Sequence, residues 1–371
     1  MEQPYQICTR CVMDTSAPDI TFDNDGVCNY CTEFIARSSH IFNKTPLQLE
    51  HELDAFVKKV KAAGKNRPYD CIVGVSGGVD SSWVLVQVLK LGLRPLAVHM
   101  DNGWNSELAQ NNISNLVQKL NVDLHTHVID WEEYRALMQA FFDADVIDVE
   151  LLTDNAMLAV NYRIAAKYRL HFILAGTNQT SEGMEIPSAG NWFKYDKKNI
   201  KALAKRFGGL RLKTFPAFSS FDYVWNQYIR SIKWISILDL MAYNKLEAMT
   251  ELQRTYGYKP YPYKHYESVF TRFYQGYILP IKFNVDKRKV HFSTLVISGV
   301  MSREDALKVL EGIPYPSAVD LENDRKYFMK KMKWDEAQLA EYLNRKEQSH
   351  SIYGSERKKW NAMARIYHKL L

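Results

Sequence analysis

The segment that most constrains this chain is the hexapeptide SGGVDS at residues 76–81, which directly follows the apolar run CIVGV at residues 71–75. An apolar run, a glycine pair and an Asp-Ser pair in this order predict a strand, a tight turn and the start of a helix. Such a turn directs backbone N–H groups and a helix N-terminus toward one point, which is an arrangement that binds phosphate. The sequence therefore predicts a polyphosphate site. A glycine-rich hairpin without a ligand is the alternative.

The loop lacks the lysine that a Walker motif requires. It resembles instead the SGGxDS pyrophosphate loop (PP loop) of the ATP pyrophosphatase superfamily, whose members cleave ATP to AMP and pyrophosphate and activate a carbonyl-type oxygen as an adenylate. The phosphate cradle that this resemblance implies consists of Val75, Ser76, Gly77, Gly78, Asp80, Ser81 and Ser82. Asp80 is also a candidate Mg²⁺ ligand, because that ion prefers oxygen donors. Helix capping is the alternative role for an aspartate here.

Four of the five cysteines lie near the start of the chain, in two C-x-x-C pairs separated by sixteen residues. The pairs are Cys8 with Cys11 and Cys28 with Cys31. In a reducing compartment this spacing predicts a tetrahedral zinc site, and four sulfur ligands leave no open position, so the metal is expected to be structural. An iron–sulfur cluster and free thiols are the alternatives. The fifth cysteine, Cys71, is expected to be buried and inert in the first strand.

Composition excludes several classes of protein. Apolar residues make up 46% of the chain, which is enough for a substantial core, and the net charge of +6 favours anionic ligands without requiring nucleic acid. The first residues do not resemble an export signal, and no apolar stretch approaches the ~20 residues of a membrane span. We therefore expect a soluble, cytoplasmic protein.

Short apolar strands alternate with helices through the first half of the chain. We expect strands at residues 71–75, 96–99, 124–129 and 172–175, and helices at 46–65, 80–91, 106–120, 131–142 and 154–168. This alternation predicts an α/β fold with a doubly wound parallel sheet. Later segments are rich in aromatic residues and lysine, with helices expected at 224–241, 334–345 and 356–371. The predicted domains are a zinc-binding arm (1–45), a PP-loop domain (46–195) and a mostly helical substrate- and partner-binding region (196–371).

Ligands of such sheets bind beyond the carboxyl ends of the strands, so residues that follow the other strands are candidates. By similarity to the superfamily, Met100 and Asp101 lie beside the adenosine; His99, just before them, is either catalytic or a core histidine. Gly176, Thr177 and Asn178 end a later strand and are expected to contact ATP. Glu182 is a candidate to hold Mg²⁺ or meet the nucleophile; a solvated loop carboxylate is the alternative.

A cationic and aromatic stretch follows at residues 263–277. Lys264 and Arg272 are eight residues apart, so a helix would place them near one face, as candidate catalytic cations for pyrophosphate or an anionic sugar nucleotide. A solvated basic face is the alternative. We expect His265, Tyr274 and Trp104 to contact the substrate.

The cysteine pairs, the loop at residues 74–81, the strand ends at 99–104 and 176–178, and the stretch at 264–277 occur in one order. Together they resemble the N-acetyl sugar amidotransferase family of bacterial surface-polysaccharide (O-antigen, lipopolysaccharide) and flagellin-glycan pathways. The resemblance implies conversion of an N-acetyl group on a nucleotide-activated amino sugar to an acetamidino group, with ATP, Mg²⁺ and structural Zn²⁺. It also implies glutamine-derived ammonia. Because no cysteine here is placed to act as a glutaminase nucleophile, we expect a separate glutaminase subunit similar to that of imidazole glycerol phosphate synthase, and a cyclase-like companion in addition is an open alternative.

Two other functions remain open from the sequence. Some tRNA-thiolating enzymes also combine a zinc ribbon with this ATP loop, although thiolation generally needs reactive cysteines near the cleft. A non-enzymatic ATP-sensing scaffold in a polysaccharide complex is the other alternative.

Overall fold

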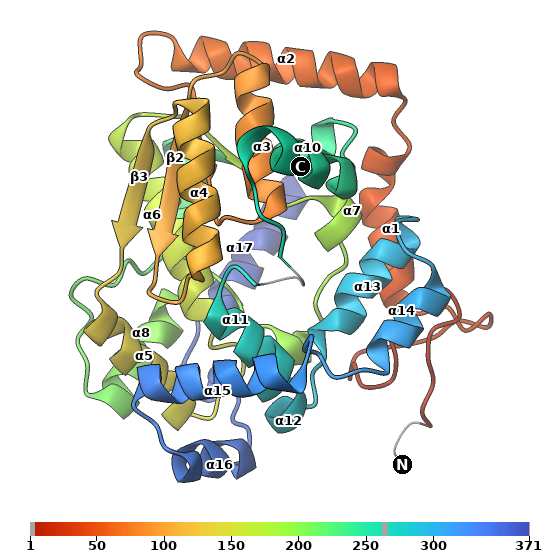
Figure 1. The fold of residues 1–371 in the computed structure, drawn as a ribbon, viewed down its shortest axis with the longest axis vertical. Coiled ribbons are helices and arrows are strands. Elements are labelled where there is room, and N and C mark those ends of the chain that lie inside the picture. Colours follow the sequence, from red (N-terminus) through yellow and green to blue (C-terminus); the bar gives the residue numbers. More distant parts are fainter. Residues whose placement is uncertain (1–3, 262–265, 371) are drawn as a thin grey trace.

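The computed structural model describes residues 4–261 and 266–370, with side chains described up to residue 365. Five parallel strands form one sheet in the order β3-β2-β1-β4-β5 (Figure 1). The strands are β1 (Cys71–Gly74), β2 (Pro95–Asp101), β3 (Leu124–Val128), β4 (Phe172–Ala175) and β5 (Lys233–Ser236). The predicted doubly wound parallel sheet is confirmed. The strand order reverses between β1 and β4, and a crevice for ligands forms at such a reversal.

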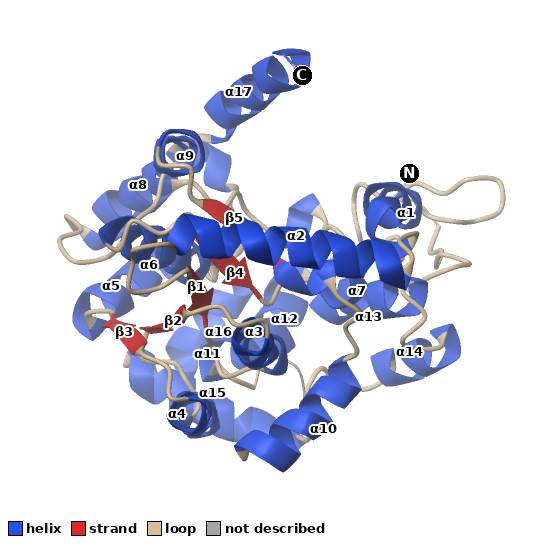
Figure 2. Ribbon diagram, turned by 90° about the horizontal axis from the view of Figure 1, so that it is seen from above, coloured by secondary structure: helices blue, strands red, loops and turns tan. Residues whose placement is uncertain are grey.

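Helices cover both faces of the sheet (Figure 2). Alternate residues of β1 point to opposite sides: Val73 packs against one group of helices and Ile72 against the other. The first group is α2 (Pro46–Gly64), α3 (Val79–Lys90), α4 (Glu107–Leu120) and α10 (Lys245–Tyr256), and α6 (Leu151–Lys167) covers the opposite face. Burial on both faces explains why the central strands β1 and β4 are short and apolar.

The expected helix at residues 224–241 is wrong. The chain instead forms α9 (Ser220–Val224), a π-helical turn (Trp225–Ile229), β5, and a 3₁₀ turn (Ile237–Leu240). Ser231 has a φ of +55°, which ends the helical segment, and β5 then pairs with β4 in the register Ile173↔Trp234. The apolar residues at 232 and 235 pack on opposite faces of the sheet. The apolar spacing that predicts a helix here is therefore produced in part by residues in and next to a strand. The sheet thus extends past residue 195, where the sequence predicts a boundary.

A second helical layer lies beyond the carboxyl ends of the strands. Its members are α5 (Trp131–Asp143), α8 (Lys197–Gly208), α11 (Val269–Phe273), α12 (Leu279–Phe283), α15 (Ala318–Met332) and α16 (Glu336–Asn344), while α17 (Arg357–Leu370) projects from one end. The largest buried cluster, rich in aromatic rings, is here. Residues 267–269 pair with the loop after β2, through Ser106 N–H to Glu267 O (2.8 Å) and Val269 N–H to Trp104 O (2.9 Å). These pairs hold α11 against the ligand edge of the sheet.

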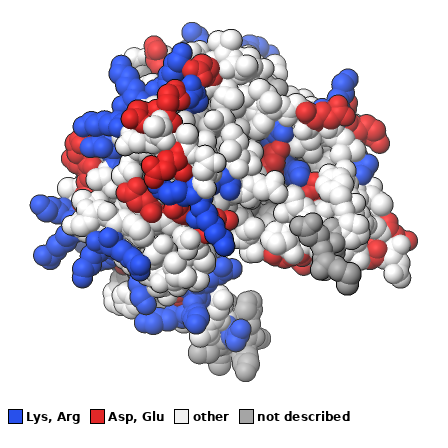
Figure 3. Space-filling view, turned by 90° about the horizontal axis from the view of Figure 1, so that it is seen from below, with Lys and Arg blue, Asp and Glu red and all other residues white. Residues whose placement is uncertain are grey.

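The N-terminal arm, its helix α1 (Asn29–Phe42), α7 (Gln179–Glu182), α13 (Lys287–Ile297) and α14 (Arg303–Leu310) lie together on one side of the molecule (Figure 1). Seen from below, Lys and Arg side chains gather at the lower left of the surface, charges of both signs are interspersed at its upper left and right, and much of the centre is uncharged (Figure 3). Among the described residues, no helix has the length and apolar character needed to cross a membrane.

Candidate nucleotide and substrate site

The loop between β1 and α3 has the conformation that its glycines allow. Gly77 has a φ of +86°, and a Cβ there would lie 2.8 Å from the carbonyl oxygen of Ala109. The hydroxyls of Ser76 and Ser81 are 3.1 Å apart, and Gly78 N–H donates to Ser76 Oγ (3.3 Å). The turn therefore leads directly into the N-terminus of α3, where backbone N–H groups and the helix dipole favour an anion.

The end of β4 presses against this loop. A Cβ on Gly176 would lie 2.7 Å from the backbone nitrogen of Ser81 and 2.8 Å from the carbonyl carbon of Asp80. Only glycine fits at such a distance from backbone atoms. The structure thus brings Gly176 and the PP loop, which are separated by about a hundred residues, together at the reversal point of the sheet.

Asp80 has partners that the sequence did not reveal. Its carboxylate accepts a hydrogen bond from the Tyr243 hydroxyl and pairs with Lys245 Nζ at 2.6 Å. Burial, followed by the charge of Asp80 and the hydrogen bond to it, raises the pKa of Tyr243, so the phenol remains a donor. Lys245 begins the helix that follows β5. A lysine at the start of a helix that follows a strand is the sequence feature that could have indicated Lys245 as a site residue. Because the sequence does not predict β5, this feature cannot be recognised from the sequence.

The turn after β2 is internally bonded. Asp101 Oδ1 accepts hydrogen bonds from Gly103 N–H (2.8 Å) and Asn105 Nδ2 (3.2 Å), and Met100 is partly buried between two core clusters. His99 is buried: its Nδ1 lies 2.8 Å from Val75 O, and its Nε2 lies 3.0 Å from Asn105 Nδ2. These partners assign a neutral ring that donates to Val75 and accepts from Asn105. His99 therefore ties β1 to the loop after β2, which favours its core alternative.

The residues after β4 divide into two roles. Asn178 is buried and caps α7, because its Oδ1 accepts from Ser181 N–H (2.9 Å) and Ser181 Oγ (3.0 Å). Thr177 and Glu182 instead line a large cavity. Thr177 Oγ1 lies 2.7 Å from Ser236 Oγ, which links the ends of β4 and β5.

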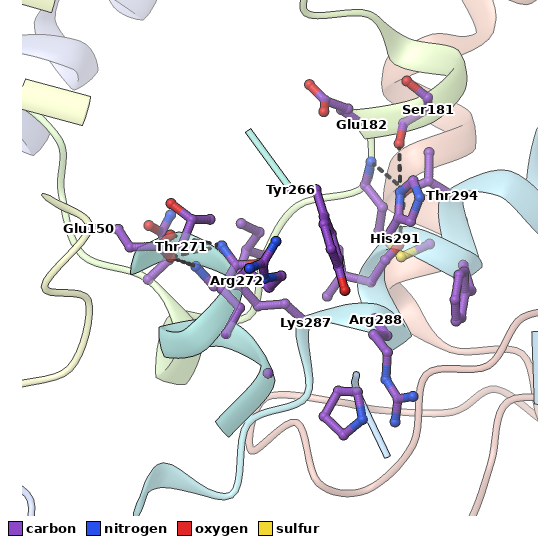
Figure 4. A pocket seen from close by; sticks show the side chains of 18 of the residues that line it. Glu150, Ser181, Glu182, Tyr266, Thr271, Arg272, Lys287, Arg288, His291 and Thr294 are labelled. Atoms are coloured by element: carbon purple, nitrogen blue, oxygen red, sulfur yellow. Dashed lines mark hydrogen bonds and ion pairs between the residues drawn. The ribbon is translucent and has the colours of Figure 1, made fainter. Parts of the chain in front are cut away.

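This cavity, of about 860 Å³, continues from the end of β4 into the second half of the chain (Figure 4). Glu150, Thr271 and Arg272 lie on one side of it and Ser181, Glu182 and His291 on the other. The polar and charged residues that line it are Glu150, Thr153, Asp154, Thr177, Ser181, Glu182, Asn191, Lys194, Tyr266, Thr271, Arg272, Gln275, Lys287, Arg288, His291 and Thr294. Its size and mixed lining suit a polar organic substrate.

Charges in the cavity are held in pairs. Glu150 accepts from Gln275 Nε2 (2.8 Å) and from Lys287 Nζ (2.8 Å), with 7% of the residue exposed. Lys194 bridges the fully buried Asp148 (2.7 Å) and Asp154 (2.8 Å). Burial opposes the charge of Asp148, but the cations and hydrogen bonds around it outweigh that effect and hold its pKa below the usual value.

Arg272 lies at the cavity but is committed to other protein groups. Its guanidinium pairs with Asp324 and lies 3.9 Å from the centroid of the Tyr266 ring. The helix that carries it, α11, begins at Val269, so the described part of residues 264–272 is not one helix. Lys264 and His265, the other predicted residues of this stretch, lie outside the described residues.

Two predicted substrate contacts are corrected. Trp104 and Tyr274 are both fully buried in the second helical layer. Trp104 packs between Trp131 and Phe270 and donates to Met138 Sδ, while the Tyr274 hydroxyl accepts from Val149 N–H. Both rings therefore belong to the core of the second helical layer and not to the cavity surface. Large aromatic side chains bury much apolar area and commonly fill such cores.

The four N-terminal cysteines converge as predicted. All are fully buried, and neighbouring sulfur atoms lie 3.6–3.7 Å apart. Zn–S bonds of ~2.3 Å in a tetrahedron place sulfur atoms ~3.8 Å apart, so the cluster fits zinc. Cys8 Sγ also accepts from the N–H groups of Cys11 (3.4 Å) and Cys28 (3.3 Å), which suits a thiolate. Cys71 is fully buried in β1, and burial raises its pKa.

Two protein families match separate segments of the chain. Residues 49–186 match the NAD synthase family, and residues 267–367 match the family described as LPS biosynthesis protein WbpG-like, C-terminal domain. A search of curated proteins gave no match.

Several solved structures are similar. NMN synthetase from Francisella tularensis is 14% identical over 60% of this chain and 99% of its own, with a TM-score of 0.31. NH3-dependent NAD synthetase from Campylobacter jejuni is 14% identical over 70% of this chain and 98% of its own, with a TM-score of 0.30. Glutamine-dependent NAD+ synthetase from Acinetobacter baumannii is 14% identical over 72% of this chain and 44% of its own, with a TM-score of 0.33.

The parallel sheet, the loop after β1 and the NAD synthase match define a PP-loop protein, an ATP-using enzyme of the carbon–nitrogen ligase type. More particularly, the WbpG-like domain that follows makes this chain a PP-loop protein of lipopolysaccharide biosynthesis. The expected combination of a PP-loop domain with a surface-polysaccharide biosynthesis domain is thereby confirmed.

Proposed function

We propose that this protein is an ATP-dependent amidotransferase that converts the N-acetyl group of a nucleotide-activated amino sugar to an acetamidino group, with AMP and pyrophosphate as coproducts. The observation that carries the proposal is the shared cavity. Its walls come from both matched segments: Thr177 and Glu182 follow β4 of the NAD synthase match, and Thr271 and Arg272 belong to the WbpG-like match. Residues of the NAD synthase-like segment and residues of the WbpG-like segment thus line one space.

The reaction explains why ATP is needed. An amide is a poor electrophile because its oxygen is a poor leaving group. Attack of the amide oxygen on the α-phosphorus of ATP releases pyrophosphate and, as the amide nitrogen loses its proton to solvent, forms an O-adenylated imidate. Ammonia then adds to the imidate carbon, and AMP departs with the former amide oxygen. Loss of the proton that ammonia brought leaves the amidine.

The PP loop and its neighbours have distinct roles in this proposal. The N-terminus of α3 and the loop N–H groups bind the departing pyrophosphate, since preorganised donors stabilise developing charge. Mg²⁺, when bound, neutralises charge on the phosphates, and Asp80 and Glu182 are the oxygen donors assigned to it. Lys245, released from Asp80, supplies a further cation to the phosphates.

The remaining predicted roles are retained as proposals. Met100 and Asp101 border the adenosine, and Gly176 and Thr177 border the phosphates or ribose. Arg272, oriented by Asp324, is proposed to face an anionic part of the sugar nucleotide. Lys264 and His265 are proposed for the same substrate on sequence grounds alone.

Ammonia is proposed to come from a separate glutaminase subunit. Four cysteines are grouped in one buried cluster, and Cys71 is sealed inside β1. Purified protein supplied with ATP, Mg²⁺ and acceptor should therefore turn over with ammonium but not with glutamine. Comparable rates with the two nitrogen sources would contradict a separate subunit.

The tRNA-thiolation alternative is less well supported. A thiol at the reacting centre would be needed, and Cys71 is fully buried with a raised pKa. Binding to tRNA whose log affinity falls steeply with log salt concentration would revive this alternative.

Mass spectrometry tests the reaction class. UDP- and CMP-linked N-acetyl amino sugars are incubated with the protein, ATP, Mg²⁺ and ammonium. The proposal predicts a product one mass unit lighter than its precursor, because NH replaces O. If every sugar nucleotide is recovered unchanged while the protein binds ATP, the proposed acceptor class is wrong.

A further inference from the structure

One wall of the cavity is formed by residues 179–190 together with α13, and we call it the arm-side wall. Two hydrogen bonds join its parts: Met184 N–H donates to Thr294 Oγ1 (3.3 Å), and His291 Nδ1 lies 3.2 Å from Ser181 O. All four residues line the cavity (Figure 4). The position of this wall therefore sets the width of the space in which substrate binds.

The cysteine arm is attached by its own backbone to α13 and to α14, the helix that packs against α13. Arg303, at the start of α14, donates to the carbonyl oxygens of Cys8 (2.8 Å) and Cys11 (3.0 Å). Val12 N–H donates to the hydroxyl of Ser293, a fully buried residue of α13 (3.2 Å). The carbonyls that Arg303 holds belong to two of the four cysteines, so this contact requires the conformation of the first C-x-x-C turn.

The same arm is attached to residues 179–190. Ser38 of α1 donates to Gln179 Oε1 (2.9 Å), and Arg37 donates to Gly183 O (2.5 Å). Met184 is part of the buried cluster that contains the four cysteines, and Val290 of α13 packs against that cluster. Both parts of the wall thus rest on one small core whose centre is the cysteine cluster.

The wall between arm and cavity is one residue thick. A second, small cavity of about 30 Å³ lies between the arm and the wall, and Ile186, Lys287 and Val290 line both cavities. Lys287 also carries the ion pair to Glu150. A shift of the arm therefore reaches charged groups of the large cavity through a single layer of side chains.

We propose that the four-cysteine arm, with its metal bound, positions the arm-side wall, and that Arg303 and Ser293 are the positioning residues that connect the two. The proposal rests on zinc as the metal and on the cavity as the acceptor site of the proposed function. Zinc occupancy then controls acceptor binding, while the sheet and the PP loop keep their structure without it.

Hydrogen exchange followed by mass spectrometry tests this without any substrate. Arg303→Ala removes one attachment of the arm but leaves every cysteine in place, and Ser293→Ala removes another. Arg254→Ala, which breaks an exposed pair with Glu251 on α10, is the matched control. Each protein is compared with wild type and with wild type stripped of zinc by a chelator.

The expected result is local. Arg303→Ala keeps its zinc, and its exchange at residues 179–190 and 287–297 rises about tenfold or more, as in the zinc-free protein, while β1, β2 and α3 exchange as in wild type. Arg254→Ala changes none of these segments. Unchanged exchange at both wall segments in Arg303→Ala and in the zinc-free protein would overturn the proposal, and so would an equal rise throughout the chain.

Ligand binding separates this inference from the proposed function. Arg303→Ala should bind ATP with wild-type affinity but raise the KM of the acceptor found by mass spectrometry, with partial recovery in Arg303→Lys. A general loss of stability would instead weaken ATP and acceptor together, which would contradict a positioning role. If no sugar nucleotide is an acceptor, the exchange result still decides whether the arm holds the wall.

Discussion

The Asp80 side chain does not cap the helix in whose first turn it lies, although capping is the simplest role for an aspartate at this position. An aspartate in the first turn of a helix is often a cap, yet α3 has no side-chain cap, and Asp80 turns instead toward Tyr243 and Lys245. The carboxylate is therefore held at the loop by groups from beyond β5. This arrangement suits the proposed role of Asp80, whose carboxylate would exchange Lys245 for Mg²⁺ when nucleotide binds.

Asp80→Asn should reduce pyrophosphate release by about 100-fold or more, because a charged ligand of the phosphates and metal is lost. The partly exposed pair with Lys245 contributes less than about 1 kcal/mol, so the fold should remain intact. A coupled pyrophosphate assay and urea unfolding measure the two effects. Asp54→Asn, which removes an exposed pair with Lys58, is the control. Wild-type rates in Asp80→Asn would refute the assigned role.

Asp148 makes stability depend on pH. Its folded pKa lies below the usual ~3.9, so its stabilising contribution is present above that pH and is lost as pH falls through the folded value. Asp148→Asn should lower the free energy of unfolding at pH 7 by about 1.5–3 kcal/mol, since a hydrogen-bonded charge beside Lys194 is lost. The difference from wild type should shrink as pH falls below about 4. Chemical unfolding across this range provides the measurement, and a difference that grows toward low pH would contradict the assignment.

Among the elements, β4 and α3 approach each other more closely than any side chain permits. Gly176→Ala should cost about 1–3 kcal/mol of stability and weaken ATP binding, because its Cβ would meet backbone atoms of Asp80 and Ser81. Urea unfolding and equilibrium dialysis with ATP test this. Gly312→Ala, whose nearest neighbour would lie 3.7 Å away, should change neither. ATP affinity equal to wild type in Gly176→Ala would show that the β4 end does not shape the nucleotide site.

The N-terminal arm has little core besides its cysteine cluster and the residues packed around it. Cys8→Ser should reduce bound zinc from one per chain to a small fraction and lower the melting temperature by several degrees, since metal binding contributes folding energy. Cys71→Ala, at a cysteine buried elsewhere, should keep its zinc. Metal analysis and thermal unfolding compare the variants. If Cys8→Ser keeps both its zinc and its melting temperature, the cluster is not a zinc site.

For the whole molecule, the sequence predicts best what is encoded locally. The PP loop, the paired cysteines and four strands each carry a short signal of their own, and the structure contains all of them. Features that depend on distant partners were missed. The sequence predicts a helix where β5 lies, because only pairing with β4 makes that segment a strand. Without β5, nothing in the sequence places Tyr243 and Lys245 beside the PP loop. The sequence predicts substrate contacts for Trp104 and Tyr274, but both side chains are buried by packing within the second helical layer.

In the proposed function, the loop after β1 binds ATP for cleavage between its α and β phosphates, which drives amidation of the acceptor sugar. Phosphorus NMR of the protein with ATP, Mg²⁺, ammonium and the panel of UDP- and CMP-linked N-acetyl amino sugars tests it most directly. We expect AMP and pyrophosphate in equal amounts, formed only when an acceptor sugar is present and about 100-fold or more slowly in Asp80→Asn. Formation of ADP and phosphate, or AMP release that is independent of every sugar and unchanged in Asp80→Asn, would contradict it.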